Sequence, residues 1–315
     1  MDEAVGVMRG FLAPTDRNWF DFLAGRGVQD EVNFWSPSGT NFRALRAGEP
    51  FFFKMKAPDN AIGGFGIFVR AEPLPIWLAW ESFGEANGAD GEAGLLARIN
   101  VNRAGATATV STPIGCRILA DPVFFPRDAW VRTPQDWSTS IVSGKGYPLD
   151  HGEGARIWSA CLEAASALSA APLWVEAAEQ EARFGRPQLV RPRLGQGGFR
   201  LAVFDAYSRA CCVTGEHSLP VLEAAHIRPY AQGGRHEVRN GLPLRRDLHR
   251  LFDLGYVTVR PDFSFVVGER LRLEYDNGRS YYALNGKRLH VPEPAGLRPA
   301  EEFLSYHNEK VFRAS

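Results

Sequence analysis

The stretch LEAAHIRPYAQGGRHEVRNGLPLRRDLHRLFDLG runs from Leu222 to Gly255 and holds three of the chain's seven histidines. Its pattern predicts four successive elements. A strand ends at His226, a turn-rich loop follows, extended structure resumes at Asn240, and a short helix stops at Gly255. The order strand, loop, strand, helix is that of a hairpin packed against a helix, which would bring side chains from all three elements towards one point.

The residue types in this stretch suit hydrolysis of a phosphodiester bond. That reaction needs a base to take a proton from water and a cation to stabilise the charge that develops on phosphate. His226 suits the first task, because the pKa of a histidine lies near neutrality. His249 and Asp253 are four residues apart, so they share one helix face and offer nitrogen and oxygen donors to a divalent ion. Taken singly, each is more often structural, and only the combination points to catalysis.

The pattern resembles the HNH nucleases, which have a ββα-metal fold and are named after residues that His226, Asn240 and His249 match here. The segments CVTGEHSLPVLEAAHIRPYAQGG and NGLPLRRDLHRLFDLGYV resemble the zinc-free bacterial subgroup found in restriction and defence genes. The resemblance covers about residues 195–310. It implies that His226 is the general base and that Asn240 holds the loop and the base in place. It also implies that His249 is a metal ligand, with Asp253 as another.

One departure from the family concerns the residue before the base, which in many HNH enzymes is a metal-binding Asp, Glu or His and here is Ala225. The metal would then have fewer protein ligands, with water and phosphate filling the rest, and neither Glu223 nor Asp247 is assigned as a ligand. His217 and His236 are expected to be structural or solvated. The expected cofactor is a divalent ion, Mg²⁺ first, with Mn²⁺, Ni²⁺ or Co²⁺ as alternatives. No structural zinc is expected, because the four cysteines contain no C-x-x-C pair.

Charge is distributed unevenly along a chain whose formal net charge is zero. Residues 191–250 carry ten arginines and no lysine against five acids, a local charge of +5. A basic face of this kind is what phosphate binding requires, although a solvated surface is the alternative. The candidates for contacts with DNA phosphates are Arg200, Arg228, Arg245, Arg246 and Arg250.

Residues 1 to about 150 are rich in aromatic residues, glycine and short apolar runs. This pattern predicts short strands in EPFFFKM, GGFGIFVR and CRILADPVFF, with few helices. An opening helix is expected in TDRNWFDFLAG, capped by Thr15 or Asp16 and stopped by Gly25. GEGARIWSACLEAASALSAA has helical periodicity, and FRLAVFDAYSRA predicts an amphipathic helix. Cys212 is expected to pack beneath the 222–245 hairpin. The tail RLRLEYDNGRSYYALNGKRLHVP contains two turn signals and predicts a hairpin or three-stranded meander.

The first 165 residues resemble the PUA-like superfamily, with its EVE, ASCH and SRA branches, in the order of RAGEPFFFK and IGGFGIFV. The resemblance implies a small β-barrel with an aromatic-walled pocket that receives a base flipped out of the duplex. The alternative for each aromatic residue is that it belongs to the barrel core. The pocket candidates are Trp35, Ser36, Asn41, Phe42, Lys145 and Tyr147.

The predicted architecture is α+β. It comprises an N-terminal PUA-like β-barrel that reads modified bases (1–165), a helical linker (166–194) and a C-terminal ββα-metal HNH domain with added β-hairpins (195–315). This layout is that of modification-dependent restriction endonucleases. We therefore expect a metal-dependent deoxyribonuclease that acts on modified double-stranded DNA, reads modified cytosine by base flipping and works as a homodimer.

Two alternatives remain open from the sequence. The first domain could sense RNA, a backbone modification or a nucleotide instead of a modified base, or the chain could bind nucleic acid without cutting it. The first twenty residues lack a basic region followed by an apolar stretch, and no apolar run approaches the roughly 20 residues that span a bilayer. Together with scattered cysteines, this favours a cytoplasmic location without a membrane partner.

Overall fold

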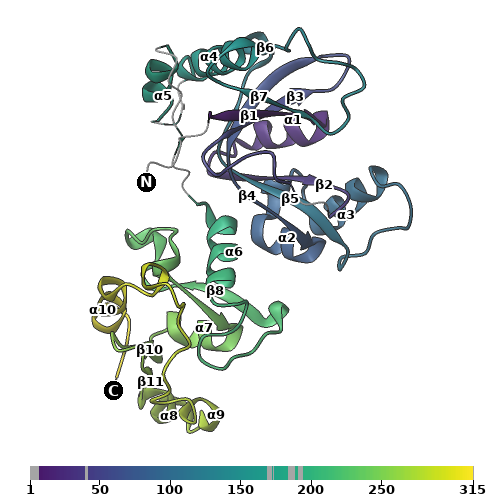
Figure 1. The fold of residues 1–315 in the computed structure, drawn as a ribbon. Coiled ribbons are helices and arrows are strands. Elements are labelled where there is room, and N and C mark those ends of the chain that lie inside the picture. The colour runs from purple at the N-terminus through teal and green to yellow at the C-terminus, as the bar shows by residue number, and fades with distance from the viewer. Residues whose placement is uncertain are drawn as a thin grey trace. The chain divides into compact units, whose positions relative to one another are not determined.

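The computed structural model of the chain describes residues 7–39, 42–168, 172, 174–183, 189–190 and 194–314. It divides into two compact units, Met1–Gly195 and Gln196–Ser315, each of which has its own core (Figure 1). No helix in the described part of the chain is both long and apolar enough to cross a membrane. The two units are described separately below.

A mixed sheet forms the centre of the first unit, with strands in the order β2-β5-β4-β3-β1-β7 and β6 paired to β4. Only β1 and β3 run parallel; the other pairs are antiparallel. Register shifts in β3–β4 and β4–β5 mark bulges, which bend strands. β2 and β7 are the two ends of this order, so the described pairings form an open, bent sheet. The strands are β1 (Arg9–Thr15), β2 (Glu31–Ser36), β3 (Pro50–Met55), β4 (Ala61–Pro75), β5 (Pro113–Phe124), β6 (Val131–Arg132) and β7 (Lys145–Pro148).

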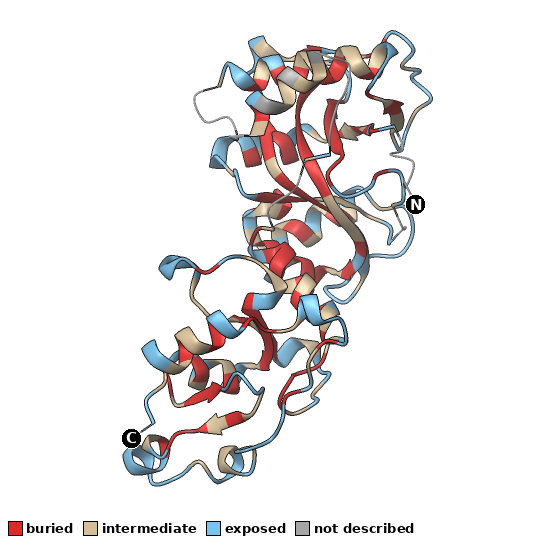
Figure 2. Ribbon diagram, turned by 60° about the vertical axis from the view of Figure 1, so that its left-hand side comes forward, coloured by how far each residue is buried: buried red, intermediate tan, exposed pale blue. Residues whose placement is uncertain are grey.

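Three consecutive phenylalanines in β3 explain why both faces of this sheet are covered. Successive strand residues point to opposite faces. Phe51 and Phe53 pack with α1 (Arg17–Arg26), while Phe52 packs on the other side with α4 (Gly152–Ser166), and all three rings are fully buried. α5 (Trp174–Arg183), inside the segment expected as a linker, joins the α4 side. Figure 2 shows the resulting run of buried residues along the central strands.

The opening helix is confirmed, with one correction at its end. The side chain of Asp16 caps α1 by accepting from the backbone N–H groups of Asn18 and Trp19 at 3.0 and 3.2 Å. The helix does not stop at Gly25 but continues to Arg26. Gly27 ends it with a φ of +62°, a left-handed conformation that glycine adopts without strain.

The expectation of few helices in this unit is wrong. α2 (Ile76–Phe83), the 3₁₀ turn η1 (Gly84–Asn87) and α3 (Glu92–Val101) lie between β4 and β5. The run PLPIWLAWESF looks strand-like because it is almost continuously apolar, yet its buried residues at 76, 79 and 83 follow the helical period.

The second unit begins with α6 (Gln196–Ala206) and continues with the predicted hairpin and helix. β8 (Leu222–His226) and β9 (Gly241–Arg245) pair antiparallel with His226 opposite Gly241, and α7 (Arg246–Asp253) follows directly. Asn240 belongs to a 3₁₀ turn just before β9 rather than to the strand itself. Cys212 is buried in the same core, and its backbone N–H donates to the carbonyl of Pro243 at 2.9 Å.

The predicted hairpin or meander in the tail is wrong. A small hairpin, β10 (Val257–Val259) with β11 (Phe265–Val267), precedes that segment, which itself folds into α8 (Arg270–Tyr275) and α9 (Arg279–Tyr282). The first turn signal ends one helix and starts the next, because Asp276 adopts a left-handed φ of +48° as the C-cap of α8. The chain then leads through α10 (Glu301–Lys310).

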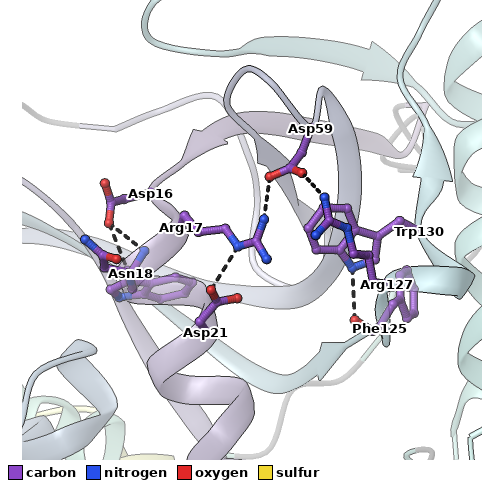
Figure 3. A network of polar contacts seen from close by, with 9 residues as sticks. Asp16, Arg17, Asn18, Asp21, Asp59, Phe125, Arg127 and Trp130 are labelled. Carbon is purple, nitrogen blue, oxygen red and sulfur yellow. Dashed lines mark hydrogen bonds and ion pairs between the residues drawn. The ribbon is translucent and has the colours of Figure 1, made fainter.

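An ion-pair network joins three segments of the first unit (Figure 3). The carboxylate of Asp59, whose side chain is only 8% exposed, accepts from Arg17 at 2.7 Å and from Arg127 at 2.8 Å. Both guanidinium groups also lie over the ring of Trp130, at 5.5 and 5.7 Å from its centroid. The network fixes the start of α1 against the β3–β4 turn and the segment after β5. Arg17 additionally pairs with the exposed Asp21 at 2.8 Å.

We predict that Asp59→Ala lowers the free energy of unfolding of the first unit by about 1–3 kcal/mol, because two charge-assisted hydrogen bonds are lost at a shielded carboxylate. All eight tryptophans lie between Trp19 and Trp174, so tryptophan fluorescence in a denaturant titration reports on this unit alone. Asp21→Ala is the matched control, since it removes an exposed partner of the same arginine and should cost less than ~1 kcal/mol. Equal losses in the two variants would contradict the assignment.

Candidate active site

His226 stands at the end of β8 between two aromatic side chains of the second unit. Its Nε2 lies 3.1 Å from Nδ1 of His236, and its ring stacks on Phe199 of α6 with centroids 4.0 Å apart and planes 15° apart. The ring of His236 stacks in turn on Tyr230, at 4.4 Å and 19°. The imidazole of His226 therefore has a fixed orientation.

The surroundings of His226 disfavour its protonated form. Burial first, and then the neighbouring His236 and His249, lower the pKa of His226 to about 4. At neutral pH the ring is consequently uncharged and retains one nitrogen lone pair. A neutral imidazole held in place is what acceptance of a proton from water requires.

Asn240 ties together the loop that follows β8. Its fully buried side chain accepts from the backbone N–H of Arg228 at 2.9 Å and donates to the carbonyls of Arg228 and Arg235, both at 3.0 Å. Gly234 lies against this link: a Cβ there would come within 2.0 Å of the Arg228 carbonyl and 2.9 Å of Nδ2 of Asn240. The amide thus spans the loop between the two strands and fixes its shape, with both of its N–H groups engaged and the side chain fully buried.

The same loop is also held by a side chain of α10. The hydroxyl of Tyr306 in α10 donates to the side-chain carbonyl of Gln232. The guanidinium of Arg228 lies 4.8 Å from the centroid of the Tyr306 ring and donates to the backbone carbonyl of Gln232 at 2.8 Å. A helix about 75 residues further along the chain therefore buttresses the loop next to His226.

His249 projects from α7 between two carboxylates. Nδ1 lies 2.7 Å from Oε2 of Glu223, and Nε2 lies 3.4 Å from Oδ2 of Asp253. Arg246 pairs with the other oxygen of Glu223 at 3.2 Å. Burial raises the pKa of Asp253 from its ordinary value.

The donor set around His249 fits a divalent ion in its chemistry. When Glu223 accepts the Nδ1–H, the Nε2 lone pair faces Asp253, an arrangement that orients many metal-binding histidines. Two donor atoms each about 2.1 Å from one ion stand about 3.0–3.4 Å apart at the usual coordination angles. The separation of 3.4 Å between Nε2 of His249 and Oδ2 of Asp253 fits this spacing. Within the described residues no group of three or more His, Cys, Asp or Glu side chains is arranged to hold one metal ion, and Ala225 is buried.

The five arginines proposed to contact phosphate differ in their surroundings. Arg200 donates to the carbonyl of Leu222 and lies over Phe204, and Arg245 pairs with Asp247. Arg228 contacts Gln232 and Tyr306, as described above. Arg246 pairs with Glu223. Arg250 is exposed on α7.

Sequence reasoning missed three partners at this site. Glu223 was left undecided and contacts His249, whereas Asp247, the other acidic alternative, is engaged by Arg245. His236 was expected to be structural or solvated, and it contacts the nitrogen of His226. Phe199, which stacks on His226, is an apolar residue that nothing in the sequence marks as part of a site. The available clue was that Glu223 and His226 share one strand, next to the helix that carries His249. His217 is exposed.

In the first unit a cavity of about 380 Å³ opens beside α1, β1 and β2. Its aromatic wall is formed by Phe11, Trp19, Phe34, Trp35 and Phe51. Of the predicted pocket residues, Trp35 and Ser36 line it. Phe42 packs behind the wall against Phe11 and Phe51, and Asn41 lies outside the described residues.

Lys145 and Tyr147 do not line this cavity. Their side chains both bind Asp136, the ammonium at 2.5 Å and the hydroxyl at 2.8 Å. Besides Ser36, the cavity's polar side chains come from residues that were not pocket candidates, including Asp16, Lys56 and Arg117. Arg117 lies with its guanidinium 5.2 Å from the centroid of the Phe42 ring, and burial lowers its pKa.

Comparison with known proteins identifies the hairpin and helix. Residues 211–260 match the HNH endonuclease family, so this part of the chain is an HNH endonuclease domain. No curated protein matches the chain. Among solved structures, a modification-dependent TagI restriction endonuclease aligns with 14% identity over 90% of this chain and 76% of its own, at a TM-score of 0.31. A TM-score that low does not define a shared fold.

We predict that Asn240→Ala frees the loop at residues 228–240. Removing the amide leaves three backbone groups without their partner, which should lower the local free energy of opening by about 2–4 kcal/mol. Hydrogen exchange at the amides of this loop measures the change. Asn277→Ala, which removes an exposed amide bonded only to the N–H of Gly278, is the control and should leave loop exchange unchanged. Unchanged protection in the Asn240 variant would show that the amide does not hold the loop.

Proposed function

We propose that the chain is a metal-dependent DNA endonuclease that hydrolyses phosphodiester bonds. The observation that carries this proposal is the neutral, oriented imidazole of His226 in an HNH endonuclease domain that also holds the His249–Asp253 pair. His226 is the general base, Asn240 the residue that shapes its loop, and His249 with Asp253 the metal-binding pair. Glu223 orients His249.

The reaction is a displacement at phosphorus by water. His226 accepts a proton from the water as its oxygen bonds to phosphorus, and the bond from phosphorus to the leaving sugar oxygen breaks. That oxygen then takes a proton from solvent. His249 and Asp253 would hold a divalent ion, with Mg²⁺ as the first choice, which would supply positive charge to stabilise the negative charge that develops in the reaction.

Arginines of the second unit position the DNA backbone. Arg250 is exposed and lies one residue beyond His249, which makes it the first candidate for a phosphate contact. Arg246 touches Glu223, so phosphate binding there would compete with an existing ion pair. Contacts of this kind add affinity that is independent of base sequence and falls with salt.

We further propose that the first unit is a PUA-like reader and that the whole chain is a modification-dependent restriction enzyme. The cavity supports this idea, because its volume and aromatic wall suit a planar base. A flipped modified cytosine would stack against Trp35, and the cost of unstacking, a few kcal/mol, would be offset by stacking and polar contacts in the pocket. Arg117 supplies a donor for a base carbonyl.

Double-strand cleavage calls for a second catalytic centre, since one ββα unit attacks one strand at a time. We propose a homodimer, either preformed or assembled on DNA, because symmetric pairs are the most common oligomers of soluble proteins.

We predict that His226→Ala lowers cleavage of DNA by at least ~100-fold while leaving DNA affinity within about twofold, because a general base acts on the reacting water and not on binding. Single-turnover cleavage and fluorescence anisotropy measure the two quantities. His217→Ala, an exposed histidine of the same unit, serves as the control and should cleave normally. Near-normal cleavage by the His226 variant would remove it from the role.

Cleavage should require a divalent ion and stop in chelator. His249→Ala should raise the concentration of Mg²⁺ or Mn²⁺ needed for half-maximal cleavage by at least ~10-fold, because it removes both the nitrogen donor and the contact of Glu223. Titration calorimetry with Mn²⁺ on the DNA-free protein gives a second readout. Full activity in chelator would disprove the metal assignment.

The reader assignment predicts a preference for modified duplex. The full chain carrying His226→Ala should bind duplexes with 5-methylcytosine or 5-hydroxymethylcytosine more tightly than the unmodified duplex, and Trp35→Ala should abolish that difference while leaving salt-dependent binding. Glu163→Ala, exposed on α4, is the control. Equal affinity for all duplexes would exclude a base reader, and the nuclease assignment would stand unaffected.

A further inference from the structure

The contact between His226 and His236 contains one proton whose position decides which nitrogen of His226 is available. A neutral imidazole carries one N–H and one lone pair. The two facing atoms, Nε2 of His226 and Nδ1 of His236, are 3.1 Å apart, a hydrogen-bond distance, so one of them donates and the other accepts. If His236 donated, His226 would carry its proton on Nδ1 and would have no lone pair left for water.

We infer that His236 is a positioning residue whose Nδ1 accepts the Nε2–H of His226 and thereby leaves the Nδ1 lone pair of His226 for the attacking water. This inference deepens the proposed nuclease function and rests on it for the role of the water. The contact itself exists independently of any activity.

The surroundings of His236 hold the acceptor where this role requires it. Tyr230 stacks on one face of the ring, at 4.4 Å and 19°. The ring of His236 meets that of His226 nearly edge-on, at 5.0 Å and 67°. The residue just before it, Arg235, gives its carbonyl to Asn240 at 3.0 Å, so the loop that carries the acceptor is fixed by the same amide that bridges to Arg228.

The other faces of His226 leave little choice of partner. Phe199 covers one face of the ring at 4.0 Å and offers no hydrogen bond. On β8 the preceding residue is Ala225, which carries no polar atom in its side chain. Of the charged or titratable groups that act on His226, His236 makes the direct contact and His249 acts through its charge. The position of the proton on His236 therefore decides the tautomer of His226, a task that a carboxylate performs in other hydrolases.

The direct test is the tautomer of His226. Protein labelled with ¹⁵N in its histidine rings is measured by NMR at neutral pH without metal or DNA, and the signals of His226 are assigned by their loss in His226→Gln. The expected result is a protonated Nε2 and an unprotonated Nδ1. The opposite tautomer overturns the inference. Because this measurement needs no cleavage, it stands even if the proposed nuclease function fails.

A matched pair of variants tests the consequence for catalysis. Asn and Leu have similar size and lack the aromatic ring, but only Asn places an acceptor oxygen near the position of Nδ1. His236→Leu should lower kcat at least ~10-fold with KM for DNA unchanged, because loss of the group that sets a catalytic histidine's tautomer is costly. His236→Asn should restore most of that loss.

The alternative is a purely structural role for His236, in which the ring matters and the acceptor does not. In that case the Leu and Asn variants would lose activity equally, which overturns the inference. His217→Leu is the control for replacing an exposed loop histidine and should behave as the unmodified protein. Normal kcat in His236→Leu would equally overturn it.

Discussion

The amide of Asn240 is the constraint on which the candidate site in the second unit depends. A loop of more than ten residues separates β8 from β9, and a loop of that length has no single shape of its own. One buried side chain closes it by bonding the backbone at both Arg228 and Arg235. His236, the partner of His226, follows directly after the second attachment point. The orientation of His226 thus depends on a fully buried residue whose side-chain N–H groups are both taken up by the loop backbone.

The second unit was the more predictable from sequence, and the reason is local. The hairpin and α7 are contiguous in the chain, and their apolar spacing and the Gly255 stop follow directly from short-range rules. The contacts that complete the site are not local in this sense. Glu223 reaches His249 across 26 residues, and Phe199 stacks on His226 from a separate helix. These contacts form only when separate elements pack together in the folded unit, so no short-range sequence pattern predicts them.

The first unit was harder to predict because its hydrophobic pattern is ambiguous. A sheet with helices on both faces has strands that are apolar on both sides, as in Phe51–Phe53. A buried helix such as α2 is also almost continuously apolar in sequence, so the two cannot be told apart by hydrophobicity. The cavity illustrates the same point. Two of its lining residues, Trp35 and Ser36, are among the sequence candidates, but Lys145 and Tyr147 instead bind Asp136. A single acid, nine residues before Lys145 in the loop that precedes β7, binds both side chains.

The buttress from α10 ties the loop beside His226 to a helix made much later in translation. While the chain emerges from the ribosome, the hairpin and α7 can form long before Tyr306 has been synthesised. During that interval Arg228 and Gln232 lack their contacts with Tyr306. The support of the loop beside His226 is therefore complete only after α10 has been made.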